Sequence, residues 1–154
     1  MSLLGLLVLA AAPMAADQPA SDASRGTGQC QAARAVPISR TRLDRSGTWS
    51  ARQVMDLRFE TRLRPGTEAT EVEFRVYAPG GHLYRTLKVP VNLDVPESRG
   101  DLERRRPPDD AQASMPVSGT GIVRNGLYGT WKVVPHLVGD ARPCGRPFSF
   151  DLAP

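Results

Sequence analysis

Apolar and polar residues alternate along several short segments of this chain. The clearest case is 71–77, where one parity is charged or aromatic and the other is apolar. Period-two alternation is typical of a strand with one buried and one solvent-facing side. Glycines at 80 and 81 supply a turn, because glycine tolerates positive φ, and 82–91 alternates again. The pattern predicts a β-hairpin over 71–91 whose core-facing residues are Val72, Phe74, Val76, Leu83, Leu87 and Val89.

Further alternating segments flank this hairpin, and turn signals separate them. We expect strands at 36–38 (a short edge strand), 54–63, 115–123, 129–138 and 148–152. Trp131 is expected in the core and Trp49 at one end of it, and no segment has helical periodicity. Short strands at regular spacing favour an all-β fold, an antiparallel sandwich of about seven strands.

Three segments together carry a resemblance to a known family. They read Val-Glu-Phe-Arg-Val-Tyr-Ala-Pro-Gly-Gly at 72–81, Leu-Tyr-Gly-Thr-Trp-Lys-Val at 127–133 and Phe-Ser-Phe at 148–150. Over residues 54–152 the chain resembles immunoglobulin-like domains of bacterial surface and macroglobulin-type proteins. The resemblance implies an immunoglobulin-like β-sandwich in which Trp131 fills the core. Cys144-Gly145-Arg146 departs from the thioester motif Cys-Gly-Glu-Gln, so no protease-trapping chemistry is implied.

The first sixteen residues contain no charged side chain and end in small residues. This apolar segment is shorter than the roughly 20 residues that a membrane anchor needs. It fits a signal peptide, residues 1–16 with cleavage near 16–20, although the usual basic start is missing. A buried N-terminal helix or strand is the alternative. We therefore predict an exported protein, periplasmic or extracellular, without a transmembrane anchor.

Composition divides the remaining chain into three parts. Residues 17–35 are rich in small and polar residues and are expected to be a flexible leader. A single β-sandwich domain is expected over 36–154. Within it, 94–114 is charged and contains prolines, so we expect a long mobile loop. This loop contains the cell-adhesion tripeptide Arg99-Gly100-Asp101, which we interpret as a chance match.

The two cysteines, Cys30 and Cys144, lie near the two ends of the expected mature chain. In an oxidising compartment such a pair predicts one disulfide. Closing so long a loop would stabilise the fold by roughly 4–5 kcal/mol in the chain-entropy model. Two isolated thiols without nearby histidines do not make a zinc site, so no metal is expected. The histidines, His82 and His136, are each interpreted as exposed polar residues.

Charge and candidate catalytic groups narrow the possible functions. The net charge is only +4 and the arginines are scattered, so a nucleic-acid partner is not expected. There is no Gly-x-Ser-x-Gly motif, and Glu71 and Glu73 share one solvated strand face rather than opposing each other across a cleft. We predict no catalytic residues and no cofactor. A small enzyme with an unrecognised site stays an alternative.

Tyr77, His82 and Tyr84 form the candidate binding patch. Both plausible hairpin registers point all three side chains away from the core. Exposed aromatic rings can stack on sugars or anchor a protein partner, although packing against residues 17–50 is the alternative. We predict a non-catalytic exported binding or scaffold module of the cell envelope, whose partner is another envelope protein contacted through a sheet face or edge. A carbohydrate-binding accessory protein that uses these aromatics is the alternative.

Overall fold

The computed structural model describes residues 26–41, 43, 47–91 and 110–154. The expected signal peptide, the leader up to residue 25 and residues 94–109 of the expected mobile loop lie outside these described residues, so those predictions stay untested.

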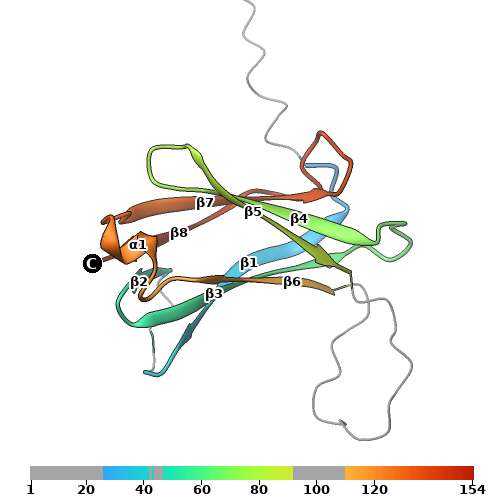
Figure 1. Cartoon of the computed structure of the whole chain (residues 1–154). Helices are drawn as coiled ribbons and strands as arrows, with labels where there is room; N and C mark the ends of the chain where they lie inside the picture. The colour runs from blue at the N-terminus through green and yellow to red at the C-terminus, as the bar shows by residue number, and fades with distance from the viewer. Residues whose placement is uncertain (1–25, 42, 44–46, 92–109) are drawn as a thin grey trace, which may run out of the picture.

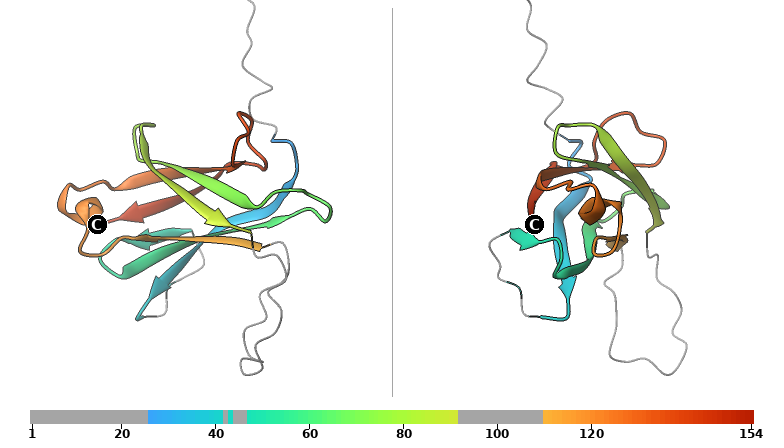
Figure 2. Two further views of the ribbon diagram at one scale, coloured as in Figure 1. Left: turned by 45° about the vertical axis from the view of Figure 1, so that its right-hand side comes forward. Right: turned by 60° about the vertical axis from the view of Figure 1, so that its left-hand side comes forward.

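The described residues form eight strands in two sheets, where the pattern predicted about seven strands. The three-stranded sheet has the order β1 (Cys30–Ser39), β3 (Val54–Leu63), β6 (Asp110–Pro116), and both of its strand pairs are antiparallel. The five-stranded sheet has the order β2 (Thr48–Ser50), β8 (Phe148–Ala153), β7 (Gly129–Leu137), β4 (Glu71–Tyr77), β5 (Leu83–Pro90). In this second sheet only β2 runs parallel to its neighbour, β8. The all-β fold of two packed sheets is thus confirmed (Figures 1 and 2).

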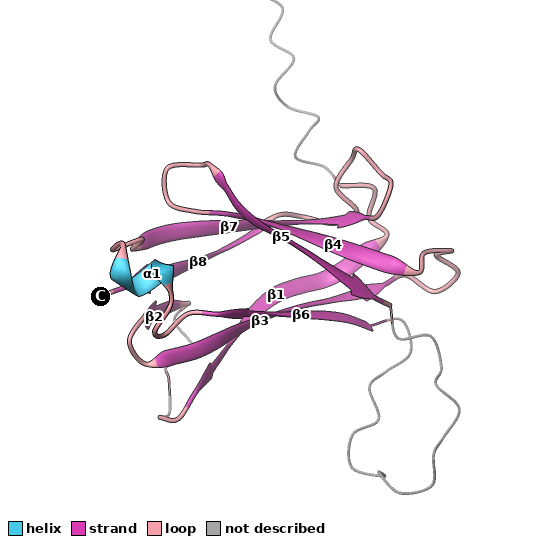
Figure 3. Ribbon diagram, viewed as in Figure 1, coloured by secondary structure: helices cyan, strands magenta, loops and turns pink. Residues whose placement is uncertain are grey.

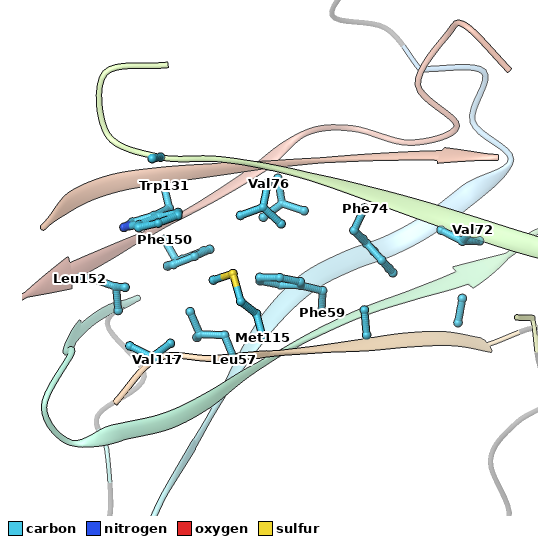
Figure 4. Packing of buried hydrophobic residues seen from close by; sticks show 14 of the residues in the cluster. Leu57, Phe59, Val72, Phe74, Val76, Met115, Val117, Trp131, Phe150 and Leu152 are labelled. Atoms are coloured by element: carbon cyan, nitrogen blue, oxygen red, sulfur yellow. The ribbon is translucent and has the colours of Figure 1, made fainter. Parts of the chain in front are cut away.

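The core lies between the two sheets, and alternate residues of each strand fill it. The Phe59 ring of the three-stranded sheet packs against Phe74, Phe148 and Phe150 of the other sheet, at centroid distances of 6.1, 6.2 and 6.0 Å. Figure 4 shows Phe59, Phe74 and Phe150 between the two layers. The predicted inward positions of Val72, Phe74, Val76 and Trp131 are confirmed, since all four are fully buried. The same core contains seven further strand residues: Leu57, Phe59, Leu63, Val133, Leu137, Phe150 and Leu152.

Trp49 closes one end of this core, as the sequence predicted. Its side chain is 7% exposed and its ring stacks on Phe150 at a centroid distance of 6.0 Å. Strand β2 holds it there through the parallel pairing with β8.

A single helical turn, α1 (Gly121–Arg124), replaces the second half of the strand expected at 115–123 (Figure 3). The prediction is wrong there because Gly119 adopts a φ of +73° and ends the extended chain. The Thr120 hydroxyl then accepts a hydrogen bond from the backbone N–H of Ile122 at 3.2 Å and caps the helix. Ile122 is fully buried under the sheets. No described helix is long and apolar enough to cross a membrane.

The two predicted polar segments are shorter than expected. Strand β1 already begins at Cys30, so residues 30–35 are not part of a leader. Strand β6 begins at Asp110, so residues 110–114 are not part of a loop. Both predictions are wrong because β1 and β6 are held as strands by their hydrogen-bonded pairing with β3, one on each side of it. Their inward residues are mostly small. Small inward residues give a weak hydrophobic period.

The predicted disulfide between Cys30 and Cys144 is confirmed. It joins the start of β1 to the β7–β8 loop, and backbone hydrogen bonds reinforce this junction: Cys30 N–H to Cys144 O at 2.8 Å, and Thr27 N–H to Pro143 O at 2.9 Å. The backbones approach so closely that a Cβ added at Gly145 would lie 2.8 Å from the Cys30 carbonyl oxygen. Glycine is therefore required at position 145.

Candidate functional site

The β4–β5 hairpin contains a bulge that the sequence did not reveal. Val76 pairs with Arg85, but the next residue of β4 pairs with Leu83, so Tyr84 is an extra residue on β5. One extra residue reverses the inward and outward sides of the strand. The Tyr84 ring consequently packs edge-on against the buried Trp131 at a centroid distance of 5.1 Å. Leu83 is instead 52% exposed. The predicted outward orientation of Tyr84 and inward orientation of Leu83 are both wrong.

The three residues of the candidate binding patch are therefore not one surface. Tyr77 lies on the outer face of the five-stranded sheet and is partly exposed, and His82 is exposed in the hairpin turn. Because the Tyr84 ring faces the core, only one of the two tyrosine rings proposed to bind carbohydrate is on the surface. The register instead places Tyr77 between Leu83 on β5 and Lys132 on β7. We call Tyr77, Leu83 and Lys132 the hairpin patch.

An ion-pair cluster lies beside the hairpin patch on the same outer face. Arg75 Nε lies 2.6 Å from Glu73 Oε1, and Lys88 Nζ lies 3.8 Å from Glu73 Oε2. The hydrogen bond from Arg75 lowers the pKa of Glu73 below its ordinary value, although partial burial opposes this effect. Glu73 is thus an ionised carboxylate already engaged by two cations, whereas Glu71, on the same face of β4, is exposed.

His136 is the cross-strand neighbour of Glu73, and it is only 4% exposed. The prediction that it is an exposed polar residue is wrong. The β7–β8 loop folds back beside β7, with a bridge between His136 and Pro143, and its backbone at Asp140 and Arg142 lies against the imidazole. Nδ1 of His136 has no hydrogen-bond partner within the described residues. Burial lowers the pKa of His136, and the positive charge of Arg75 lowers it further.

The described residues also include an open depression of about 600 Å³ beside the disulfide. Its lining is mostly backbone, glycine and alanine, and Arg146 is its one charged residue. No group of three or more metal-ligating side chains occurs within the described part of the chain. The depression therefore offers no nucleophile beside a base, and the outer face of the five-stranded sheet is the better candidate site.

Comparison of the chain with protein-family models, with curated proteins and with solved structures finds no match in any of the three. The candidate site is therefore argued from its geometry.

Proposed function

We propose that this protein is a non-catalytic, exported binding module that contacts another protein of the cell envelope through the outer face of its five-stranded sheet. The observation that carries the proposal is the hairpin patch. An exposed leucine, a tyrosine and a lysine lie side by side on rigid strands, and the β5 bulge sets the leucine outward. Tyrosine is among the side chains that carry most of the binding energy in protein–protein contacts, and the exposed leucine beside it adds apolar area to the same surface.

The finer fold type that we propose is an immunoglobulin-like sandwich with added strands. The sheet orders β1-β3-β6 and β2-β8-β7-β4-β5 match an arrangement in which the hairpin strand β5 extends the sheet of the last two strands. A tyrosine just before β7 supports the proposal, because the Tyr128 hydroxyl donates a hydrogen bond to Val123 O at 3.3 Å. This resembles the tyrosine corner of immunoglobulin domains. The disulfide departs from that pattern, since it joins β1 to the β7–β8 loop.

Export is supported by two independent features. The disulfide suits an oxidising compartment, and residues 1–16 are apolar and uncharged. Deleting residues 2–16 should keep the protein in the cytoplasm with reduced cysteines. Fractionation with thiol labelling checks this expectation, and an oxidised, exported deletion variant would contradict the proposal.

Site-specific photocrosslinking in the native host tests the binding surface. A photoreactive residue at Lys132, on the hairpin patch, should give a discrete crosslinked product. The matched control is Arg58, whose side chain is 42% exposed on the outer face of the three-stranded sheet. Products of equal intensity from both positions, or none from Lys132, would argue against a partner on the five-stranded sheet.

A further inference from the structure

Strand β5 is the edge of the five-stranded sheet, and part of its backbone faces away from its neighbour. The Val91 N–H donates to Thr70 O at 2.8 Å, and this bond fixes which residues of β5 bond to β4. Because antiparallel ladders alternate, the N–H and C=O groups of Thr86 and Lys88 point to the outside. Pro90 follows in the same phase, so its missing N–H removes no bond to β4.

The other edges are less suited to accept a strand. Strand β2 at the opposite edge of this sheet has three residues. In the three-stranded sheet, β1 is bulged after Gln31, and Ala32 has a φ of +50°. Strand β6 bears one charge, Asp110, which Arg62 already engages at 3.0 Å. Among the edges of the described strands, β5 thus combines a regularly paired stretch, from Arg85 to Pro90, with basic side chains and no acidic one.

The charge on β5 is entirely positive. Arg85 and Lys88 are both exposed, and β5 carries no acidic residue. Arg85 makes no ion pair within the part of the chain that the structure describes. Lys88 lies 3.8 Å from Glu73, whose other oxygen Arg75 contacts at 2.6 Å, so the carboxylate is shared between two cations. A strand added beside β5 would therefore meet Arg85, which has no such ion pair, on one side of the strand and Lys88, which shares a carboxylate, on the other.

A second copy of β5 is a poor occupant of this edge. Antiparallel pairing of two copies would place their Arg85 side chains on one face and their Lys88 side chains on the other, with no acidic residue from either β5 strand, and facing like charges destabilise a strand pair. Basic residues and a proline on an edge strand protect a sheet from pairing with itself. The same positive charge favours a strand that carries acidic side chains. The edge therefore disfavours pairing with a second β5 and favours pairing with an acidic strand.

We propose that β5 binds an extended acidic segment of a protein partner, which adds a strand to the five-stranded sheet. Main-chain hydrogen bonds to Thr86 and Lys88 would supply the attachment, and pairing with Arg85 and Lys88 would select the charge. This inference rests on the proposed function and names the partner's chemistry at the edge next to the hairpin patch.

The experiment uses the full chain and two labelled peptides: a Val-Glu peptide with Glu residues on both faces of the strand, and a Val-Lys peptide in which Lys replaces each Glu. Fluorescence polarisation measures their affinities. Thr86→Pro removes an N–H that points away from β4, so it should block strand addition and leave the hairpin intact. Arg85→Glu reverses one charge of the edge. Arg52→Glu is the matched control, because Arg52 is exposed in the turn after β2, at the opposite edge of the sheet.

The wild type and Arg52→Glu should bind the Val-Glu peptide equally and the Val-Lys peptide at least about tenfold more weakly. Thr86→Pro and Arg85→Glu should each weaken Val-Glu binding by about tenfold or more. Far-UV circular dichroism and the thermal midpoint confirm that each variant is folded. Equal binding by Thr86→Pro, or an equal loss in Arg52→Glu, would overturn the proposal.

The photocrosslinking experiment separates this inference from the proposed function. Crosslinks from Lys132 that persist in Thr86→Pro and Arg85→Glu would retain a partner on the outer face and reject strand addition. Loss of those crosslinks together with peptide binding would support both. Peptide binding without any crosslink from Lys132 would support strand addition at β5 and argue against a partner on the outer face of the sheet.

Discussion

The outer faces of the two sheets are both charged, but their charges are arranged differently. On the three-stranded sheet the carboxylate of Glu60 accepts Arg34 at 2.8 Å and Arg58 at 2.6 Å, and the Arg62–Asp110 pair lies next to it. Exposed pairs of this kind contribute only about 0–1 kcal/mol. Each of these three arginines therefore contacts a carboxylate, and Arg34 and Arg58 share that of Glu60.

On the five-stranded sheet, the cations outnumber the acids near the hairpin. Arg85 and Lys132 make no ion pair within the described residues, and Tyr77 lies between Lys132 and the exposed Leu83. His136 belongs to the same face, but it is buried. The comparison teaches that the number of charges does not distinguish the two faces. What distinguishes them is whether each charge already has a partner, and the following predictions test this difference.

The largest expected effect on stability comes from removing the disulfide that links the two sheets. Replacing both cysteines, Cys30→Ser with Cys144→Ser, removes a link between residues separated by 114 positions. The chain-entropy model predicts a loss of roughly 4–5 kcal/mol in the free energy of unfolding. Urea unfolding of this variant and of the oxidised wild type measures it. Equal midpoints would show that the backbone contacts at Gly145 hold the junction alone.

The second effect separates the two hairpin tyrosines. Tyr84→Ala removes the ring that packs on Trp131 and should destabilise the protein by about 2 kcal/mol. Tyr77→Ala removes a ring from the outer face and should change stability by about 0.5 kcal/mol or less. The opposite should hold for the Lys132 crosslink, which only Tyr77→Ala should weaken. Equal destabilisation by both variants would contradict the bulge.

The third effect is a dependence of stability on pH that comes from His136. Its folded pKa lies below the ordinary value of 6.5, because burial and Arg75 disfavour the charged form. The unfolded chain therefore binds the proton first as the pH falls. The stabilisation is complete above pH 6.5 and is lost as the pH falls from there through the folded pKa.

Unfolding free energies measured across that range check the sign. His136→Gln should flatten the slope below pH 6.5. His82→Gln is the control, since His82 is the other histidine of the chain and is exposed, and it should leave the slope unchanged. The lowered pKa of Glu73 acts in a separate window, where stability is lost only as the pH falls below about 4.5 and through its folded value. A slope that survives in His136→Gln would assign it to another group.

Much of this architecture follows from period-two patterns, and the exceptions have identifiable causes. The faces of β3, β4, β7 and β8 were predictable because large apolar residues alternate with charged ones. Strands β1 and β6 were missed in part because their inward residues are mostly small, and only the pairing with β3 fixes them. Local composition contains no comparable signal for such strands.

The candidate site was less predictable than the fold. The position of Tyr84 depends on which residues of β5 pair with Val76, a property of two strands rather than one. One signal was available: Arg85 stands on the core parity of 82–91, which marks an irregular strand. The bulge lies just before Arg85 and turns Leu83 outward, while Arg85 itself stays opposite Val76 and is exposed. The alternation of residues in β7 places His136 on the outer face of the sheet. Its burial could not be predicted from that alternation, because it depends on the loop after β7 that folds back against it.

The smallest expected effect asks whether unpaired charge alone makes a binding surface. Glu60→Gln keeps the shape of the side chain but releases Arg34 and Arg58 on the three-stranded sheet. Stability should fall by about 1 kcal/mol or less, and Arg34 and Arg58 would then have lost their carboxylate partner. The affinity for the Val-Glu peptide should nevertheless stay at the wild-type value, because Arg58 lies on the central strand β3, whose backbone is paired on both sides, and Arg34 lies on β1, whose edge is interrupted by the bulge after Gln31. If Glu60→Gln increases the affinity, and adding Thr86→Pro does not abolish the increase, unpaired charge is sufficient for peptide binding without a free strand edge. The two faces would then differ in charge alone.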